Sequence, residues 1–210
     1  MAENHIMTAY RHHLRERIVD TAIRAFATRG IRAVKMDDIA HELAISKRTL
    51  YEIYDNKEDL LCAGVKKYQA LKEQQWLERM AQGGNVIDLV LQAYRSEVED
   101  FKQTTPQFYV DLERYPRVMA MFEDSQKHNR KHLLQFLERG VEEGYFRENI
   151  DYDIVILLFD AIGRQVRERQ LYMQYSIEQL FFNLVFISIR GLCTPLGAEM
   201  LDQRLKAEQG

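Results

Sequence analysis

Residues 36–54 read MDDIAHELAISKRTLYEIY, and this stretch decides the fold of the N-terminal part of the chain. Its first half places apolar residues on one helical face, which predicts a short helix over residues 36–43. Ser46 is a typical N-cap for a second helix, which we expect over residues 47–53. A helix, a tight turn and a second short helix form the helix-turn-helix layout, in which the second helix enters the major groove of DNA.

The second of these helices presents polar and charged side chains on its outward face. Lys and Arg side chains reach phosphates, and Arg, Thr and Tyr also reach base edges or the thymine methyl group. We therefore predict binding to double-stranded DNA, and the candidate contact residues are Lys35, Ser46, Lys47, Arg48, Thr49, Tyr51, Tyr54 and Lys57. Of these, Tyr54 also belongs to the set that we expect to pack inward. The alternative interpretation is the solvated face of an ordinary three-helix cluster.

Helical spacing continues on both sides of this motif. Before it we expect a helix over residues 15–29, which Gly30 ends. Residues 10–13 are expected to form a disordered tail; the alternative is that they contact a phosphate or the minor groove. After it we expect helices over residues 57–81, 86–102, 107–114, 117–143, 151–172 and 176–192, then a polar tail over 198–210 that at most forms a frayed helix. About nine helices and no strand predict an all-α fold. Its expected parts are a three-helix helix-turn-helix DNA-binding domain over residues 1–56 and a helical ligand-binding and dimerisation domain over 57–210.

The composition excludes several classes of protein. Hydrophobic residues make up 46% of the chain and charged residues 29%, as in an ordinary globular protein. The formal net charge is −3, and residues 1–56 hold nine Lys or Arg against eight Asp or Glu, so any contact with nucleic acid must be local. Cys62 and Cys193 lie far apart without CxxC spacing, which argues against a disulfide scaffold or a zinc finger. Residues 1–17 lack the apolar segment of a secretory signal and no apolar run could span a bilayer, so we expect a cytoplasmic protein without membrane contact.

Two segments of the C-terminal part, residues 154–159 and 181–189, are apolar nearly all round. Helices of this kind are buried on several sides. We expect one side to meet a second subunit, so that the chain forms a homodimer through a four-helix interface. The alternative is that a single subunit buries both helices completely.

Aromatic and methionine side chains gather within residues 85–175, where they could line an adaptable apolar pocket for a small-molecule effector. The candidate ligand-binding residues are Tyr94, Phe101, Phe108, Tyr109, Met119 and Phe122. Such residues at helical spacing are also typical of an ordinary core, which is the alternative. His128 and His132 stand four residues apart and, with Asp124, could hold a metal ion. The surrounding run is basic and repels cations, so we predict no metal site and no cofactor.

Residues 39–61 read IAHELAISKRTLYEIYDNKEDLL, and residues 25–30 read AFATRG. The combination of Ser-Lys-x-Thr-Leu-Tyr with Asn-Lys-Glu-x-Leu-Leu resembles the signature of the tetracycline-repressor (TetR) family of regulators, and the resemblance covers residues 11–61. It implies a cytoplasmic dimer that binds a pseudo-palindromic operator as a repressor. It also implies release from DNA by a small molecule held in the C-terminal helical domain.

Three positions depart from the family pattern. Ala44 occupies a turn position where the family usually has Gly, and Ala costs stability there if the backbone needs a positive φ. Arg48 stands where Gly or Pro is frequent, which adds a cation at the groove. Lys35 replaces the Thr or Ser that caps the preceding helix. A DNA phosphate at that helix end would meet both N–H donors and this lysine; the alternative is a lysine that is simply exposed to solvent.

Two other classes of function are an enzyme built on a helical bundle and a protein-interaction module whose helix-turn-helix no longer functions. Carboxylate-bridged metal bundles need paired Glu-x-x-His motifs, and the sequence contains none, nor a Walker, GxSxG or HExxH motif. A vestigial DNA reader would have no reason to keep Lys47, Thr49, Tyr51 and Lys57. We therefore predict a ligand-responsive transcriptional regulator that is not an enzyme.

Overall fold

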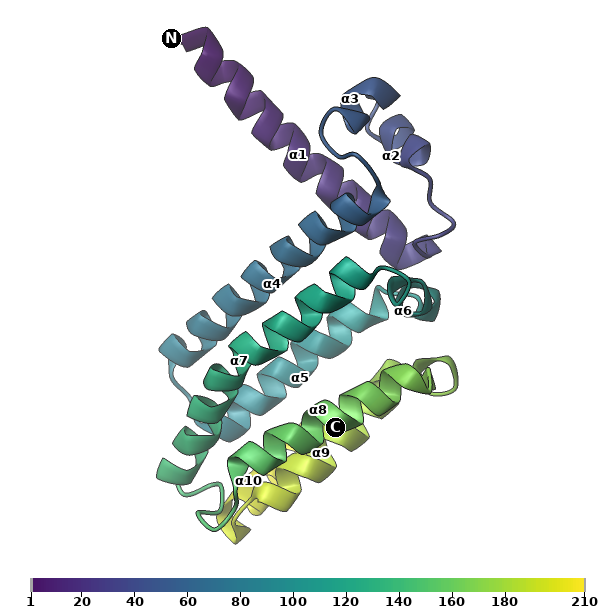
Figure 1. Ribbon diagram of the computed structural model, residues 1–210. Coiled ribbons are helices and arrows are strands. Elements are labelled where there is room, and N and C mark those ends of the chain that lie inside the picture. The colour runs from purple at the N-terminus through teal and green to yellow at the C-terminus, as the bar shows by residue number, and fades with distance from the viewer. Residues whose placement is uncertain (1, 210) are drawn as a thin grey trace. The chain divides into compact units, whose positions relative to one another are not determined.

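The computed structural model describes residues 2–209, with the side chains of residues 9–176 and 178–206. Helices make up most of this part of the chain (Figure 1). In chain order they are α1 (Ala2–Arg29), α2 (Met36–Glu42), α3 (Lys47–Tyr51), α4 (Lys57–Gln82), α5 (Val86–Lys102), α6 (Pro106–Leu112), α7 (Pro116–Glu142), α8 (Tyr152–Glu168), the 3-10 helix η1 (Leu171–Met173), α9 (Ile177–Leu192) and α10 (Pro195–Gln209). Residues 2–209 contain no β-strand, and the predicted all-α fold is confirmed.

The helices form two compact units, each with its own hydrophobic core. The first unit consists of the described residues up to 74 together with residues 103–124, so α6 and the first turns of α7 belong with the N-terminal helices. The second consists of residues 75–102 and the described residues from 125 onward. The predicted boundary between residues 56 and 57 separates a DNA-binding part from a ligand-binding part. It is a division by function, not by packing, and it stays a prediction.

The first four helices of the first unit close around one apolar core. Phe26 of α1, Ile39 of α2, Leu50 of α3 and Leu60 of α4 are completely buried in it. The predicted disordered tail over residues 10–13 is wrong, because these residues lie within α1, which begins at Ala2. Leu14 is buried in the same core, which ties the earlier turns of this helix to the unit.

The turn between α2 and α3 bends at Ala44, where φ is +52°. The Ala44 N–H donates to the His41 carbonyl oxygen at 3.0 Å, and the Ile45 N–H donates to the Ala40 carbonyl oxygen at 3.0 Å. A positive φ suits glycine, whereas a Cβ makes it unfavourable. The backbone therefore has the positive φ at which Ala44 is predicted to cost stability.

The second unit is built on the packing of α5 against α9. Two predictions for this unit are wrong. The helix expected over residues 151–172 ends at Glu168, because Gln170 adopts a φ of +48° and a 3-10 turn follows. The tail expected over residues 198–210 is the helix α10, which the core holds in place through the completely buried Leu201.

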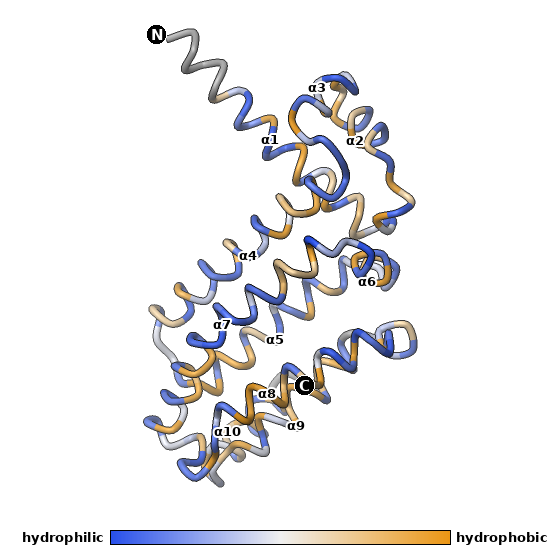
Figure 2. The backbone as a smooth tube through the Cα atoms, in the orientation of Figure 1, coloured by the Kyte–Doolittle hydropathy of each residue, from blue (hydrophilic) through white to orange (hydrophobic). Residues whose placement is uncertain are grey.

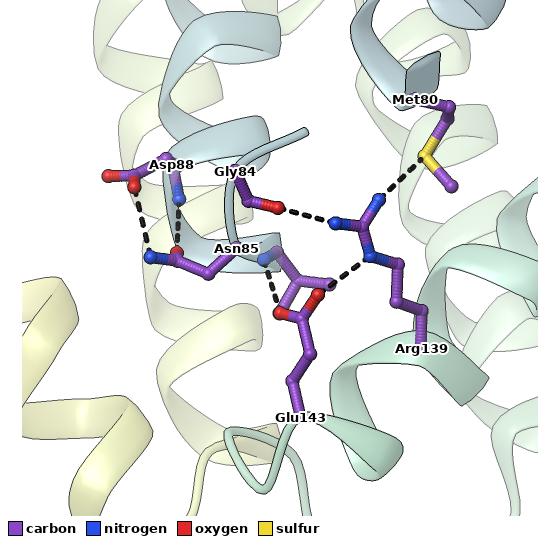
Figure 3. A network of polar contacts seen from close by, with 7 residues as sticks. Met80, Gly84, Asn85, Asp88, Arg139 and Glu143 are labelled. Carbon is purple, nitrogen blue, oxygen red and sulfur yellow. Dashed lines mark hydrogen bonds and ion pairs between the residues drawn. The ribbon is translucent and has the colours of Figure 1, made fainter. Parts of the chain in front are cut away.

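A polar network fixes the turn between α4 and α5 against the end of α7 (Figure 3). The Glu143 carboxylate accepts from the Val86 N–H at 2.8 Å and from the Arg139 Nε at 2.7 Å. Arg139 also donates to the Gly84 carbonyl oxygen. The Asn85 Oδ1 accepts from the Asp88 N–H at 2.9 Å and so caps α5. These contacts satisfy backbone groups that a helix end would otherwise leave unpaired.

Candidate nucleic-acid interface

The short helix α3 is capped at its N-terminus by one serine and anchored in the core by one leucine. The Ser46 Oγ accepts from the Thr49 N–H at 3.0 Å, which is the N-cap that the sequence predicts. Leu50 is completely buried in the core of the first unit. Because one side of α3 is anchored in this way, its other residues are held at the surface.

α3 and its N-cap bring together five of the eight residues predicted to contact DNA: the exposed Ser46, Lys47, Arg48 and Tyr51 and the half-buried Thr49. Tyr51 is 46% exposed. Two cations, two hydroxyl groups and a phenol thus share one short helix. This set of donors can bind phosphate oxygens and can also reach base edges.

Both cations of α3 are paired with carboxylates. The Lys47 ammonium forms an ion pair with Asp37 of α2, and this hydrogen bond raises the pKa of Lys47. The Arg48 Nε donates to a Glu52 carboxylate oxygen at 2.8 Å, which raises the pKa of Arg48. Both groups carry a neighbouring carboxylate as well as further donors, because an ammonium has three N–H donors and a guanidinium five.

Lys35 lies at the N-cap position of α2 with an exposed side chain that makes no capping hydrogen bond. The missing cap is partly replaced from within the helix, since an Asp38 carboxylate oxygen accepts from the Lys35 N–H at 2.8 Å. Negative charge in the first turn of a helix is favourable. The prediction that this lysine meets a DNA phosphate stays a prediction.

The other two predicted contact residues, Tyr54 and Lys57, serve the fold in the DNA-free protein. Tyr54 is only 8% exposed, with the Arg15 guanidinium 5.4 Å from its ring centre, and burial raises the pKa of its hydroxyl group. The Lys57 ammonium donates to the Ile31 carbonyl oxygen at 2.7 Å, and burial lowers its pKa. Their contacts with DNA stay predictions, and they lie outside the exposed face of α3.

One important residue escaped the sequence analysis. Asp111 of α6 is 1% exposed, and its carboxylate accepts from the Arg32 N–H and from the Gln107 side-chain amide, both at 2.8 Å. Gly30, at φ +84°, begins the turn that this carboxylate holds. The only hint in the sequence is an acid in the otherwise apolar segment PQFYVDL. Asp111 thus fixes the turn that leads into the helix-turn-helix.

The six predicted ligand-binding residues fall into different compact units. Phe108, Met119 and Phe122 pack against the core of the first unit, and the Tyr109 ring meets Phe108 edge-on. Tyr94 and Phe101 belong to the second unit, where they contact rings of α9.

In the second unit, an open depression of about 600 Å³ is lined by Tyr94, Ser176, Glu178, Gln179, Phe182, Asn183 and Leu205. Tyr94 is therefore the member of the predicted set that borders a hollow within its own unit.

The two histidines considered as metal ligands make ring contacts instead. The His132 ring stacks on Trp76 with 6.5 Å between ring centres, and the His128 ring meets His132 at 5.9 Å. Across the described part of the chain, no three His, Cys, Asp or Glu side chains gather closely enough to hold a metal ion. The described helices also include none with the length and hydropathy required to cross a bilayer.

Comparisons with known proteins point in the same direction as this geometry. Residues 18–63, which contain α2 and α3, match the family model described as bacterial regulatory proteins, tetR family. The chain is 25% identical over 146 residues to the HTH-type transcriptional repressor KstR2 of Mycobacterium tuberculosis, covering 67% of this chain and 73% of the repressor.

Solved structures share the fold across most of the chain. The ketosteroid transcriptional regulator KstR2 of Mycobacterium tuberculosis superposes with a TM-score of 0.55 at 23% identity, over 86% of this chain and 95% of that one. The transcriptional regulator FadR of Bacillus subtilis, in complex with stearoyl-CoA, gives 0.61 at 17% identity, over 84% and 98%. At these identities the likeness shows the fold alone.

Proposed function

We propose, from the premise that this chain is a member of the TetR family of transcriptional regulators, that it is a cytoplasmic repressor released from DNA by a small molecule. In this proposal a homodimer binds a pseudo-palindromic operator, with one helix α3 in each of two successive major grooves. The half-sites would lie about one helical turn, ~10 bp, apart or a multiple of it.

The observation that carries the proposal is the exposed face of α3. Ser46 caps the helix and Leu50 anchors it, so Lys47, Arg48 and Tyr51 are presented on a fixed scaffold rather than on a loop. A rigid helix reduces the conformational entropy that base contacts would cost. The exposed Tyr51 ends the same helix that carries both cations, so that one short helix offers groups for phosphates and for base edges.

The proposed dimer is supported by apolar side chains that the second unit leaves exposed. Ile154, Leu157 and Leu158 of α8 are more than half exposed, and so is Ile187 of α9. The first half of α8 is accordingly hydrophobic in Figure 2. Monomeric proteins rarely expose contiguous apolar patches of this kind. A second copy of the same surface would cover them by the two-fold symmetry usual in homodimers.

The proposed effector is a small, mainly apolar molecule bound by the helical part of the chain. Tyr94, Phe182 and Leu205 supply the apolar part of the lining of the open depression in the second unit, beside four polar side chains, and this supports such a site. The related KstR2 is described as a ketosteroid regulator, and FadR was solved with stearoyl-CoA. A ketosteroid has an apolar ring system, and stearoyl-CoA has an apolar acyl chain joined to a highly polar coenzyme. To shift operator-competent protein from 99:1 to 1:99, the effector must favour the other state by about 5.5 kcal/mol.

The proposed DNA contact is tested by fluorescence anisotropy with a duplex that the protein selects from a random library. The double variant Lys47→Ala with Tyr51→Ala should lose most operator affinity, whereas Lys66→Ala, which removes an exposed cation from α4, should retain it. Arg48→Ala should change which sequence is preferred. Intact operator affinity in the double variant would show that α3 is not the recognition helix.

The effector is tested with two probes, stearoyl-CoA and a ketosteroid. Binding should quench or shift the emission of Trp76, whose ring stacks on His132, and should lower operator affinity in the same titration. Binding of a probe that leaves operator affinity unchanged would refute the coupling between effector and DNA.

A further inference from the structure

The two carboxylates that pair with the cations of α3 lie at the same surface as those cations. Asp37 and Glu52 have side chains that are 43% and 54% exposed. A DNA backbone that approaches Lys47 and Arg48 therefore also approaches two negative charges. Phosphate can replace each carboxylate as the partner of its cation, but the carboxylate then stays behind next to the DNA.

The stability of α3 does not explain Glu52. This residue is the C-cap of α3, and a negative charge at a helix C-terminus opposes the helix dipole. The pair with Arg48 also runs in the weaker direction, because an acid is better placed four residues before a base than after it. Glu52 thus pairs with Arg48 although both its position and the order of the pair are unfavourable for the stability of α3.

The capping of α2 does not explain Asp37. The N-terminus of α2 is closed by the next residue, Asp38, whose carboxylate accepts from the Lys35 N–H at 2.8 Å. Asp37 instead reaches from α2 to Lys47 of α3. Asp37 lies in the first turn of α2, where its charge also suits the helix dipole, but its ion pair is with the recognition helix.

We propose that Asp37 and Glu52 are specificity-determining residues that suppress binding to random DNA; this inference rests on the proposed DNA-binding function. On a duplex without the right bases, releasing Lys47 or Arg48 to a phosphate leaves a carboxylate facing the backbone, and like charges repel. On the operator, a base donor such as the cytosine N4 amino group can pair with the carboxylate. The protein then discriminates between operator and random DNA because the carboxylates are repelled by the backbone of a duplex that lacks the right bases.

The charge balance of the N-terminal part fits this role. Residues 1–56 hold nine Lys or Arg against eight Asp or Glu, so their general attraction to a polyanion is weak. Sequence-independent affinity grows with the number of phosphates that cations neutralise, at about 0.9 in the salt slope per contact. A carboxylate beside each cation of α3 reduces what that cation gains from a phosphate of random DNA.

The test measures anisotropy over a range of salt, with a labelled random-sequence duplex and with the selected operator duplex. Glu52→Gln and Asp37→Asn should each tighten random-duplex binding by up to about fivefold, the range of an exposed ion pair. The salt slope should steepen by up to about 0.9 for each freed cation. Operator affinity should change less, so the ratio of specific to random binding falls.

The matched control is Glu42→Gln, which removes the same charge from a pair with Arg29, 3.4 Å apart and outside α3. It should change random-duplex affinity less and leave the ratio near that of the parent. Glu52→Asp, which keeps the charge, should bind random DNA more weakly than Glu52→Gln.

Three results would overturn the proposal. The first is that Glu52→Gln and Asp37→Asn bind the random duplex with the same affinity as Glu42→Gln. The second is that these two variants bind the random duplex and the operator duplex more weakly by the same factor. The third, a parent protein that binds no duplex at all, would also refute the proposed function, whereas the first two leave operator binding by the parent intact.

Discussion

Replacing Ala44 with glycine is expected to stabilise the protein, although the substitution removes a side chain. Ala44 holds a φ of +52° in the turn between α2 and α3, and its methyl group is exposed. No buried contact is therefore lost when the methyl group is removed. The backbone geometry of the turn is expected to stay the same, because its hydrogen bonds are made by main-chain groups.

The magnitude follows from two opposing contributions. A residue with a Cβ pays about 1–2 kcal/mol in the left-handed conformation, and glycine avoids this cost. Glycine also gives the unfolded chain more freedom, which lowers stability by about 0.4–1 kcal/mol. The net gain is about 0.5–1 kcal/mol, and in a chain of this size it corresponds to a rise of about 1–4 °C in Tm.

Circular dichroism during thermal and urea unfolding measures this gain. The matched control is Ala70→Gly, at an exposed position inside α4, where glycine should cost about 1 kcal/mol. Opposite signs for the two Ala-to-Gly changes are the expected result. A loss of stability in Ala44→Gly similar to that in Ala70→Gly would refute the assignment of strain to this turn.

Three further predictions concern buried and exposed side chains. Asp111→Ala should lower the free energy of unfolding by about 2–4 kcal/mol because it leaves the Arg32 N–H unpaired, and Asp111→Asn by less; equal losses would argue against this role. Leu158→Glu, at a residue 58% exposed, should convert a dimer to monomer in sedimentation velocity, and an unchanged dimer would exclude α8 from the interface. Burial raises the pKa of Cys193 to about 11, so its thiol stays protonated below that pH. Iodoacetamide at about pH 8 should therefore label Cys193 only after denaturation, and rapid labelling of the folded protein would contradict its burial.

The local part of the fold could be predicted from the sequence because its signals are local. Ser46 as a cap, the apolar spacing around Ile39 and the buried Leu50 are each determined within a few residues, and the structure contains all of them. The same holds for the turn at Ala44, where comparison with the family pattern identified the one residue whose φ matters. The pair of Arg48 and Glu52 also has a local signal, its spacing of four residues.

Contacts between distant residues had no such signal. Asp111 and the Arg32 N–H lie 79 positions apart, and no pattern in either segment predicts a contact with the other. The helix α10 was mistaken for a polar tail because few of its residues are apolar, and the fully buried Leu201 holds it only through tertiary contact. Ala198, Met200 and Leu205 of the same helix pack against that core as well, and helix propensity is a weak guide when such tertiary contacts decide the outcome.

The choice of ligand-binding residues by side-chain type illustrates the same limit. Aromatic and thioether side chains serve a core as well as a pocket, and in the first unit Phe108, Met119 and Phe122 lie against the core that also holds Leu50. Their position in the chain suggested the regulatory domain. Their packing instead belongs to the compact unit that contains the helix-turn-helix.

This packing has a consequence for regulation of the proposed kind. α6 is hydrogen-bonded at two points to the segment that precedes the helix-turn-helix. Thr105, which precedes α6, donates through its N–H and hydroxyl to the carbonyl oxygen of Ala27 in α1, and Asp111 accepts from the N–H of Arg32 in the turn between α1 and α2. A shift of α6 must therefore either move α2, and with it α3, or break bonds to a buried carboxylate at a cost of about 1–3 kcal/mol or more each. An effector that displaces α6 is consequently expected to change the placement of the recognition helix without contacting it.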